Sequence, residues 1–91
     1  MLTEKRIVIT GAGSGIGRAT SILAAGYGAN VVCVDINDSV SSTVEEIKNN
    51  DGAAIAVRAD VSDETAVSAF IQQCVDEFGG IDGIYANAGV S

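Results

Sequence analysis

The sequence predicts an α/β fold, a Rossmann-type doubly wound parallel sheet, on the basis of three observations. Continuous apolar runs such as Val31-Val32-Cys33-Val34 are typical of parallel strands that are buried on both faces. Segments with helical periodicity separate these runs, and glycines or Asn-Asp turns follow them. A glycine-rich stretch, residues 10–17, joins the first run to the first helical segment. Right-handed crossovers turn this alternation into a sheet with helices on both faces.

The expected order is strand-helix three times, followed by a fourth strand. Strands are expected at residues 6–10, 30–36, 53–59 and 81–86, and the third is the weakest and so is expected at an edge. The doubly wound arrangement gives the spatial order 3-2-1-4, truncated after the fourth strand. Ligands bind such sheets in the crevice at the carboxyl ends of the strands, where the strand order reverses.

Three helices are expected between the strands. The first covers residues 16–25, where Ile16, Ala19, Leu23 and neighbouring small residues are expected to make one apolar face. Residues 37–39 can cap the second, whose apolar face is thin. Ser62 is expected to cap the third, with acidic residues in its first turn. Offsets of three and four define the buried stripe of this helix: Val67, Phe70, Ile71, Cys74, Val75 and Phe78.

Length and charge bound the function. Ninety-one residues make at most one small domain, and 47% hydrophobic residues suffice for a core. The net charge of −7, without a basic run, argues against nucleic-acid and anionic-membrane partners. No signal peptide or membrane-spanning segment is expected, because a strand pattern is reached by Ile7 and no apolar run is long enough. These features favour a cytoplasmic protein.

The two cysteines, Cys33 and Cys74, lie inside apolar runs. They are expected to be buried, reduced thiols rather than a disulfide or a redox pair. The sequence contains no histidine, so a zinc or histidine-based site is not expected.

The glycine-rich loop predicts a phosphate site. The common G-x-G-x-x-G pattern does not fit in either register, but T-G-x-x-x-G-x-G does, with glycines at Gly11, Gly15 and Gly17. Gly11 allows the sharp exit from the strand, Gly15 lets the backbone approach a pyrophosphate, and Gly17 lets the helix pack close to the sheet. Ser14 and Ile16, inside the loop, are also expected to contact the cofactor. The alternative is a turn that only packs a helix onto a sheet.

Asp35 ends the second strand, about twenty residues after the loop. An acidic side chain at this place can accept hydrogen bonds from the ribose hydroxyls of the adenosine half of a dinucleotide. It would repel a 2′-phosphate, and no Lys or Arg at Ser14, Ile36 or Asn37 compensates. NAD is therefore favoured over NADP, and Ile36 is counted with the cofactor-binding residues.

Two further candidate sites follow the third and fourth strands. Asp60 could accept the adenine amino group while Val61 packs on the ring, or Asp60 could be a turn or helix-capping residue, a role for which Ser62 competes. The sequence leaves these two roles open. Asn87, Ala88 and Gly89 follow the fourth strand, where small residues let the backbone pass close to a ligand.

Together these features resemble the short-chain dehydrogenase/reductase family. The loop matches the family's cofactor loop, Asp60-Val61 its adenine-contacting pair, Asn87-Ala88-Gly89 the end of its N-N-A-G motif, and Asp35 the acidic residue of NAD-preferring members. Ala86 departs from the first Asn of that motif, which bears on support of the sheet more than on cofactor contact.

The resemblance implies a catalytic Ser, Tyr and Lys beyond the fourth strand. Tyr27 and Tyr85 are followed four residues later by Val31 and Gly89, so no Tyr-x-x-x-Lys pair exists and no catalytic residue can be assigned. Residues 1–91 are therefore expected to be the N-terminal part of one Rossmann dinucleotide-binding domain. The parent enzyme would move hydride between nicotinamide and a small-molecule alcohol or carbonyl. The alternatives are a non-catalytic NAD- or AMP-binding module, or a chain that self-associates or joins a missing C-terminal portion.

Overall fold

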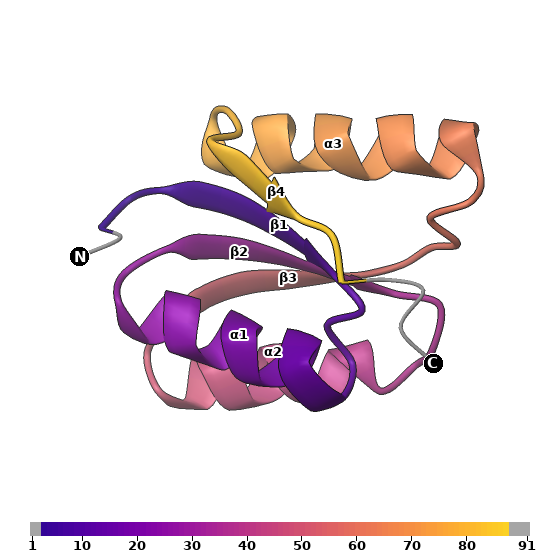
Figure 1. Cartoon of the computed structure of the whole chain (residues 1–91). Coiled ribbons are helices and arrows are strands. Elements are labelled where there is room, and N and C mark those ends of the chain that lie inside the picture. Colours follow the sequence, from indigo (N-terminus) through magenta and orange to yellow (C-terminus); the bar gives the residue numbers. More distant parts are fainter. Residues whose placement is uncertain (1–2, 88–91) are drawn as a thin grey trace.

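The structure, a computed structural model, describes residues 3–87 of the chain. Four parallel strands form one sheet, and their order β3-β2-β1-β4 confirms the predicted topology (Figure 1). The sheet is aligned so that Ile7 of the central strand pairs with Val31 on one side and Gly83 on the other. The strands are β1 (Arg6–Thr10), β2 (Asn30–Asp35), β3 (Ala53–Arg58) and β4 (Gly83–Tyr85).

Helices cover both faces of the sheet. In Figure 1, α1 (Gly15–Gly26) and α2 (Val40–Asn49) lie below the sheet and α3 (Glu64–Phe78) lies above it. Successive side chains of a strand point to opposite faces, so β1 and β2 contribute to two separate cores. One core lies under α1 and α2 and includes Ile9, Val31, Cys33 and Ile47. The core under α3 includes Val8, Val32, Val34, Phe70 and Cys74.

Both cysteines are buried and free, as predicted. Cys33 belongs to the core under α1 and α2, whereas Cys74 belongs to the core under α3, so the sheet separates them. Burial raises the pKa of the Cys33 thiol to about 11. A thiol with a raised pKa carries little thiolate at neutral pH, which makes Cys33 a packing residue rather than a nucleophile.

The expected face of α1 was wrong at its three named residues, although the neighbouring small residues that were counted with them are buried. Ile16 is 65% exposed and Leu23 is 61% exposed, and Ala19 is exposed as well. The helix instead buries its smallest residues, because only these let its backbone lie close to the sheet. The buried residues of α1 are Gly17, Ser21, Ala24 and Ala25.

The expected cap of α3 was wrong by one residue. Asp63 is the N-cap, and its carboxylate accepts hydrogen bonds from the backbone N–H groups of Thr65, at 2.9 Å, and Ala66, at 3.4 Å. The Ser62 hydroxyl is engaged with Asp60 instead. The apolar stripe is confirmed at its centre, because Phe70 and Cys74 are buried. Three others of the stripe are partly buried, and Val75 is 37% exposed.

The remaining element boundaries differ little from the prediction, except in β4. Residues 81–86 were expected to form this strand, but only Gly83–Tyr85 does so. The backbone N–H of Asp82 donates to the Arg6 carbonyl, and the Asp82 carboxylate turns back to the Arg6 side chain. Ser39 is the N-cap of α2 but its side chain makes no capping hydrogen bond.

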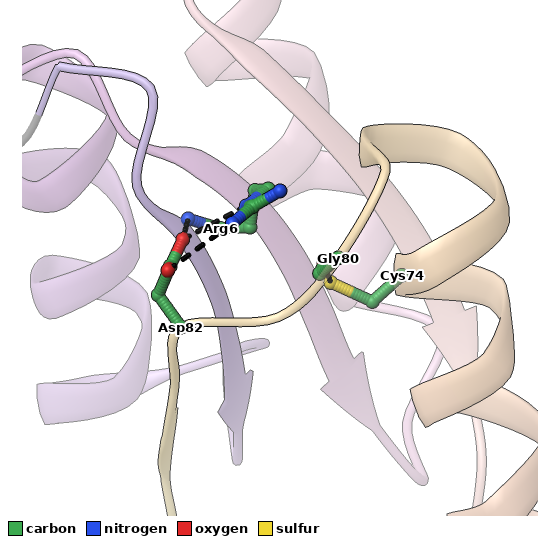
Figure 2. Close-up of polar contacts among 4 residues, drawn as sticks. All are labelled: Arg6, Cys74, Gly80 and Asp82. Carbon is green, nitrogen blue, oxygen red and sulfur yellow. Dashed lines mark hydrogen bonds and ion pairs between the residues drawn. The ribbon is translucent and has the colours of Figure 1, made fainter.

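Arg6 and Asp82 form an ion pair that joins the start of β1 to the segment before β4 (Figure 2). One carboxylate oxygen, Oδ2, lies 2.8 Å from both the Nε and the backbone N of Arg6, and Oδ1 lies 3.2 Å from Nη2. In the same region the Cys74 thiol donates to the Gly80 carbonyl. A Cβ at Gly80 would lie 2.7 Å from Nη1 of Arg6, so a larger residue there would displace the guanidinium. These contacts hold β4 beside β1.

We expect this ion pair to make stability depend on acidic pH. The hydrogen bonds from Arg6 lower the pKa of Asp82 from its usual 3.8 to about 2. A carboxyl whose pKa is lower in the folded state stabilises the fold above its unfolded value, and that stabilisation is lost as the pH falls through the folded value. The free energy of unfolding of the wild type should therefore decrease from about pH 4 to about pH 2 more steeply than that of Asp82→Asn.

Urea denaturation at a series of pH values measures this difference. Arg6→Met should also weaken the pH dependence of the free energy of unfolding in this interval, because it removes the partner that lowers the pKa of Asp82. Parallel pH profiles for the wild type and Asp82→Asn would contradict the assignment.

Candidate functional site

A cavity of about 530 Å³ lies at the carboxyl ends of β1, β2 and β3. This volume is typical of small-molecule sites. Most of the residues singled out from the sequence line it, together with Asn37 and Ala59: Gly11, Ser14, Gly15, Ile16, Asp35, Ile36, Asp60, Val61 and Asn87. Gly17 does not line the cavity but lies against Gly11, which does. Ala88 and Gly89 lie outside the described residues.

Each glycine of the predicted motif meets a different constraint. Gly11 has a φ of +67°, and a Cβ there would lie 3.2 Å from the carbonyl oxygen of Asn87. A Cβ at Gly17 would collide with the carbonyl oxygen of Gly11 and lie 2.6 Å from the carbonyl carbon. Gly15 has a φ of +58° but faces open space, with no atom within 4 Å of a Cβ. The fold therefore needs Gly17, whereas Gly15 leaves room for a ligand at the loop.

The start of α1 offers donors to such a ligand. Ser14 is extended and is the N-cap, but its side chain makes no capping hydrogen bond, and no acidic residue occupies the first turn. The first N–H groups of a helix have no intrahelical acceptor, and the helix dipole makes this end positive. An anion placed over Gly15 would meet these N–H groups.

Gly13 is a site residue that the sequence reasoning missed, because the motif treats it as variable. Its N–H donates to Oδ2 of Asp35 at 2.8 Å. A Cβ there would collide with the Ser39 hydroxyl and lie 2.9 Å from the same carboxylate oxygen. The signal was present in the density of glycines, since the extra glycine of the loop is Gly13.

Asp35 joins the loop to the end of β2. Its Oδ2 accepts from Gly13, and its Oδ1 accepts from the backbone N–H of Asn37 at 3.0 Å. A carboxylate has about four acceptor positions, so about two remain for a ligand in the cavity. The side chain is half-buried and carries charge beside Ile36 in the cavity wall. This arrangement suits a pair of vicinal hydroxyl groups.

Asp60 takes the turn role that the sequence left open. Its Oδ1 accepts from the backbone N–H of Ser62 at 2.9 Å and from the Ser62 hydroxyl at 2.7 Å. These hydrogen bonds lower the pKa of the Asp60 carboxyl. The other oxygen, Oδ2, accepts no hydrogen bond from residues 3–87, so the turn role leaves an acceptor available in the cavity. Val61, 37% exposed, supplies an apolar neighbour.

Asn87 closes the cavity over β1. Its backbone N–H donates to the hydroxyl of Thr10 at 3.0 Å, and Thr10 is buried. The Asn87 amide nitrogen faces Gly11 and Gly17, 3.3 Å and 3.0 Å from where their Cβ atoms would lie. Thr10, which belongs to the loop motif but had no assigned role, thus anchors the segment that follows β4.

A buried threonine of α2 supports the glycine loop, and no sequence pattern indicated this role. The Thr43 hydroxyl of α2 donates to the Ala12 carbonyl at 2.8 Å and accepts from Nη1 of Arg18 at 3.1 Å. Arg18 also pairs with Glu46, with 2.7 Å between nitrogen and oxygen. These contacts fasten the loop and α1 to α2, so the cavity wall is held by the fold itself.

Comparison with known proteins identifies the family. The family model described as short chain dehydrogenase matches residues 5–91. The chain belongs to the short-chain dehydrogenase family. Members are oxidoreductases that generally bind a nicotinamide dinucleotide, NAD or NADP. The family of the sequence-based resemblance is thereby confirmed.

Similar proteins agree over nearly the whole chain. The sequence is 48% identical over 90 residues to a Bacillus subtilis protein named "Uncharacterized oxidoreductase YxbG", covering 98% of this chain and 33% of that protein. It is 43% identical over 89 residues to the 2,5-dichloro-2,5-cyclohexadiene-1,4-diol dehydrogenase of Sphingobium indicum, covering 98% and 35%. The crystal structure of a hydroxysteroid dehydrogenase from Escherichia coli superposes with a TM-score of 0.94 at 40% identity, covering 98% of this chain and 38% of that one.

The chain thus spans about a third of the length of the relatives it matches. Within residues 3–87, no helix is both long enough and apolar enough to cross a membrane. In the same residues, no cluster of three or more His, Cys, Asp or Glu side chains is arranged to hold a metal ion.

Proposed function

We propose that residues 1–91 are the N-terminal, dinucleotide-binding part of a single Rossmann domain in an NAD-dependent oxidoreductase. The observation that carries the proposal is the joining of Asp35 to the glycine loop through Gly13. This contact brings a ribose acceptor and a pyrophosphate cradle to one cavity. The separation of about twenty residues between loop and acid follows the pattern of dinucleotide sites.

The cavity accommodates the adenosine diphosphate half of the cofactor. The pyrophosphate would lie over Gly15 at the start of α1, where no Cβ intrudes. The ribose hydroxyls would donate to the free acceptor positions of Asp35, and the adenine amino group would donate to Oδ2 of Asp60. Val61 and Ile36 offer apolar surface to the ring.

Other residues complete the proposed contacts. Gly11 and Gly17 shape the loop, and Ser14 and Ile16 flank the pyrophosphate. The proposed cofactor-binding residues also include the segment after β4, where Asn87 lines the cavity. The proposal extends along that segment to Ala88 and Gly89.

The charge of Asp35 supports NAD rather than NADP. A 2′-phosphate bound at this ribose would lie against a carboxylate, and juxtaposed like charges cost several kcal/mol. NAD, with a free 2′-hydroxyl, supplies the hydride acceptor when it is bound. The role of this chain is then to bind and orient that cofactor.

For the whole protein we propose hydride transfer between nicotinamide and a small-molecule alcohol or carbonyl. The names of the diol dehydrogenase and the hydroxysteroid dehydrogenase among its relatives support this substrate class. No position in residues 1–91 carries the Tyr-x-x-x-Lys pair, so the chain alone is not expected to be active. A cytoplasmic location is part of the proposal and is supported by the two buried free thiols.

An NMR titration of the ¹⁵N-labelled chain with NAD tests the binding proposal. NAD should shift the amide signals of the glycine loop, Asp35, Ile36 and Val61, and should leave the signals near the Arg6–Asp82 pair unchanged. Nicotinamide riboside is the control, since it lacks both the adenosine half and the phosphates and should shift none of them. Shifts at the Arg6–Asp82 end, or none with NAD, would contradict the proposal.

We also propose that further polypeptide, either a second copy or another part of the protein, covers one surface of this unit. On α1, Leu23 is 61% exposed and Tyr27 is 49% exposed. On β4, which is an edge strand, Ile84 and Tyr85 are 52% and 43% exposed. Unpaired strand edges and exposed apolar side chains favour association.

Light scattering at increasing concentration, combined with thermal unfolding, measures this tendency. We expect the isolated chain to be marginally stable and to form oligomers as its concentration rises. A cooperatively melting monomer at every concentration would be the opposite result.

A further inference from the structure

Arg58 stands beside Asp35 on the neighbouring strand. It ends β3, and the parallel register pairs it with Asp35 of β2. Paired residues of adjacent parallel strands point to the same face of the sheet, so both side chains lie on the face covered by α2. The guanidinium reaches the residue that follows β2, where Nη2 donates to the Ile36 carbonyl at 3.4 Å. Ile36 is itself part of the cavity wall.

The guanidinium of Arg58 is available to a ligand. Arginine has five N–H donors, and the Ile36 carbonyl takes one of them. The side chain is exposed and lies on an edge strand, so further donors face solvent next to Ile36 of the cavity wall. Arginine is also the residue best suited to hold phosphate, because its planar fork matches two phosphate oxygens.

The other cations of the chain are placed elsewhere or already paired. Arg6 is paired with Asp82, and Arg18 is paired with Glu46. Lys5 precedes β1 and Lys48 lies in the last turn of α2, so both are far from the carboxyl ends of the strands. Within residues 3–87, Arg58 is thus the one cation that contacts a residue of the cavity wall and has no carboxylate partner.

We propose that Arg58 is a second determinant of cofactor choice and that it acts against Asp35. This inference rests on the proposed function. A 2′-phosphate on the adenosine ribose would be repelled by Asp35 and attracted by Arg58. The wild-type preference for NAD is then the repulsion of the 2′-phosphate by Asp35 minus its attraction by Arg58. Without the Asp35 carboxylate, only the attraction by Arg58 should remain. Sequence reasoning missed this residue because it considered only positions next to Asp35 in the chain and within the loop.

The test compares two ligands that differ by one phosphate. One is adenosine 5′-diphosphate, and the other is the same molecule with a phosphate on its 2′-hydroxyl. Isothermal titration would give both affinities for the wild type, Asp35→Ser, Arg58→Met and the double variant. Asp35→Ser should improve the relative affinity for the 2′-phosphorylated ligand by about ten- to a hundredfold, the range of a charge-assisted hydrogen bond. The double variant should lose most of this gain, and Arg58→Met alone should widen the wild-type preference for the ligand without the 2′-phosphate.

Two controls separate a specific contact from general charge. Lys48→Met removes the same charge at the far end of α2 and should leave the gain of Asp35→Ser intact. Arg58→Lys keeps the charge without the fork and should retain part of the gain. The exposed position of Arg58 makes unfolding of these variants unexpected, and circular dichroism would verify their fold.

The outcomes distinguish a failure of the role given to Arg58 from a failure of the proposed function. Asp35→Ser and the double variant could gain equally in relative affinity for the 2′-phosphorylated ligand while adenosine 5′-diphosphate binds normally. That result would overturn the role of Arg58 alone. No binding of adenosine 5′-diphosphate by the wild type would overturn the proposed function and this inference together.

Discussion

Gly17→Ala is expected to destabilise the chain more than any other single methyl addition in the loop. The new Cβ would collide with the Gly11 carbonyl oxygen and lie 2.6 Å from its carbon and 3.0 Å from the Asn87 amide nitrogen. Two of these atoms belong to the backbone, which cannot rotate away as a side-chain end can. Overpacking of this kind costs about 1–3 kcal/mol and occasionally more. A domain of this size has about 5–15 kcal/mol at most, so the loss is a large fraction.

Urea denaturation followed by circular dichroism measures the effect. Gly26→Ala is the matched control, because it adds the same methyl to the same helix where no atom lies within 4 Å. That change should be neutral or stabilise by about 0.4–1 kcal/mol, since alanine restricts the unfolded chain. Equal unfolding midpoints for the two variants would mean that α1 does not pack against the loop as described.

Asp35→Asn is expected to have the largest effect on cofactor binding. The amide keeps the shape and one acceptor oxygen, but it removes the negative charge to which the N–H groups of Gly13 and Asn37 donate. The ribose hydroxyls would donate to the same charge. Hydrogen bonds to charged groups contribute about 1.5–3 kcal/mol, so NAD affinity should fall by about tenfold or more. The penalty on NADP should shrink at the same time, because the repulsion disappears.

Competitive titration with both dinucleotides measures this change. Asp38→Asn is the matched control, since Asp38 is exposed, lies three residues away and does not line the cavity. It removes the same charge and should leave the ratio of the two affinities nearly unchanged. If both variants reduced the ratio of NAD affinity to NADP affinity to a similar extent, the preference would follow from net charge rather than from Asp35.

The sheet could be predicted from the sequence because its signals are local. Runs such as Val31-Val32-Cys33-Val34 are apolar on both faces, and the structure buries both faces of β2. Crossover handedness then leaves little choice for the strand order. The positions of Gly11 and Gly17 could also be read from the motif, because each marks a place where a side chain cannot fit.

What could not be predicted depends on contacts between distant residues. The buried face of α1 was misread because large apolar residues, Ile16 and Leu23, were expected inside, whereas close packing on the sheet selects small ones. The hydrogen bond between Gly13 and Asp35 joins residues 22 apart in the chain. Arg58 reaches the site through the pairing of two strands, which no spacing in the sequence reveals.

The affinities of the unmodified chain for NAD and NADP test the central claim most directly. Isothermal titration under identical buffer conditions should show binding of NAD, with NADP weaker by about tenfold or more, given the cost of like charges at Asp35. NADP binding as tightly as NAD, or no binding of NAD, would contradict the assignment of this cavity as an NAD site.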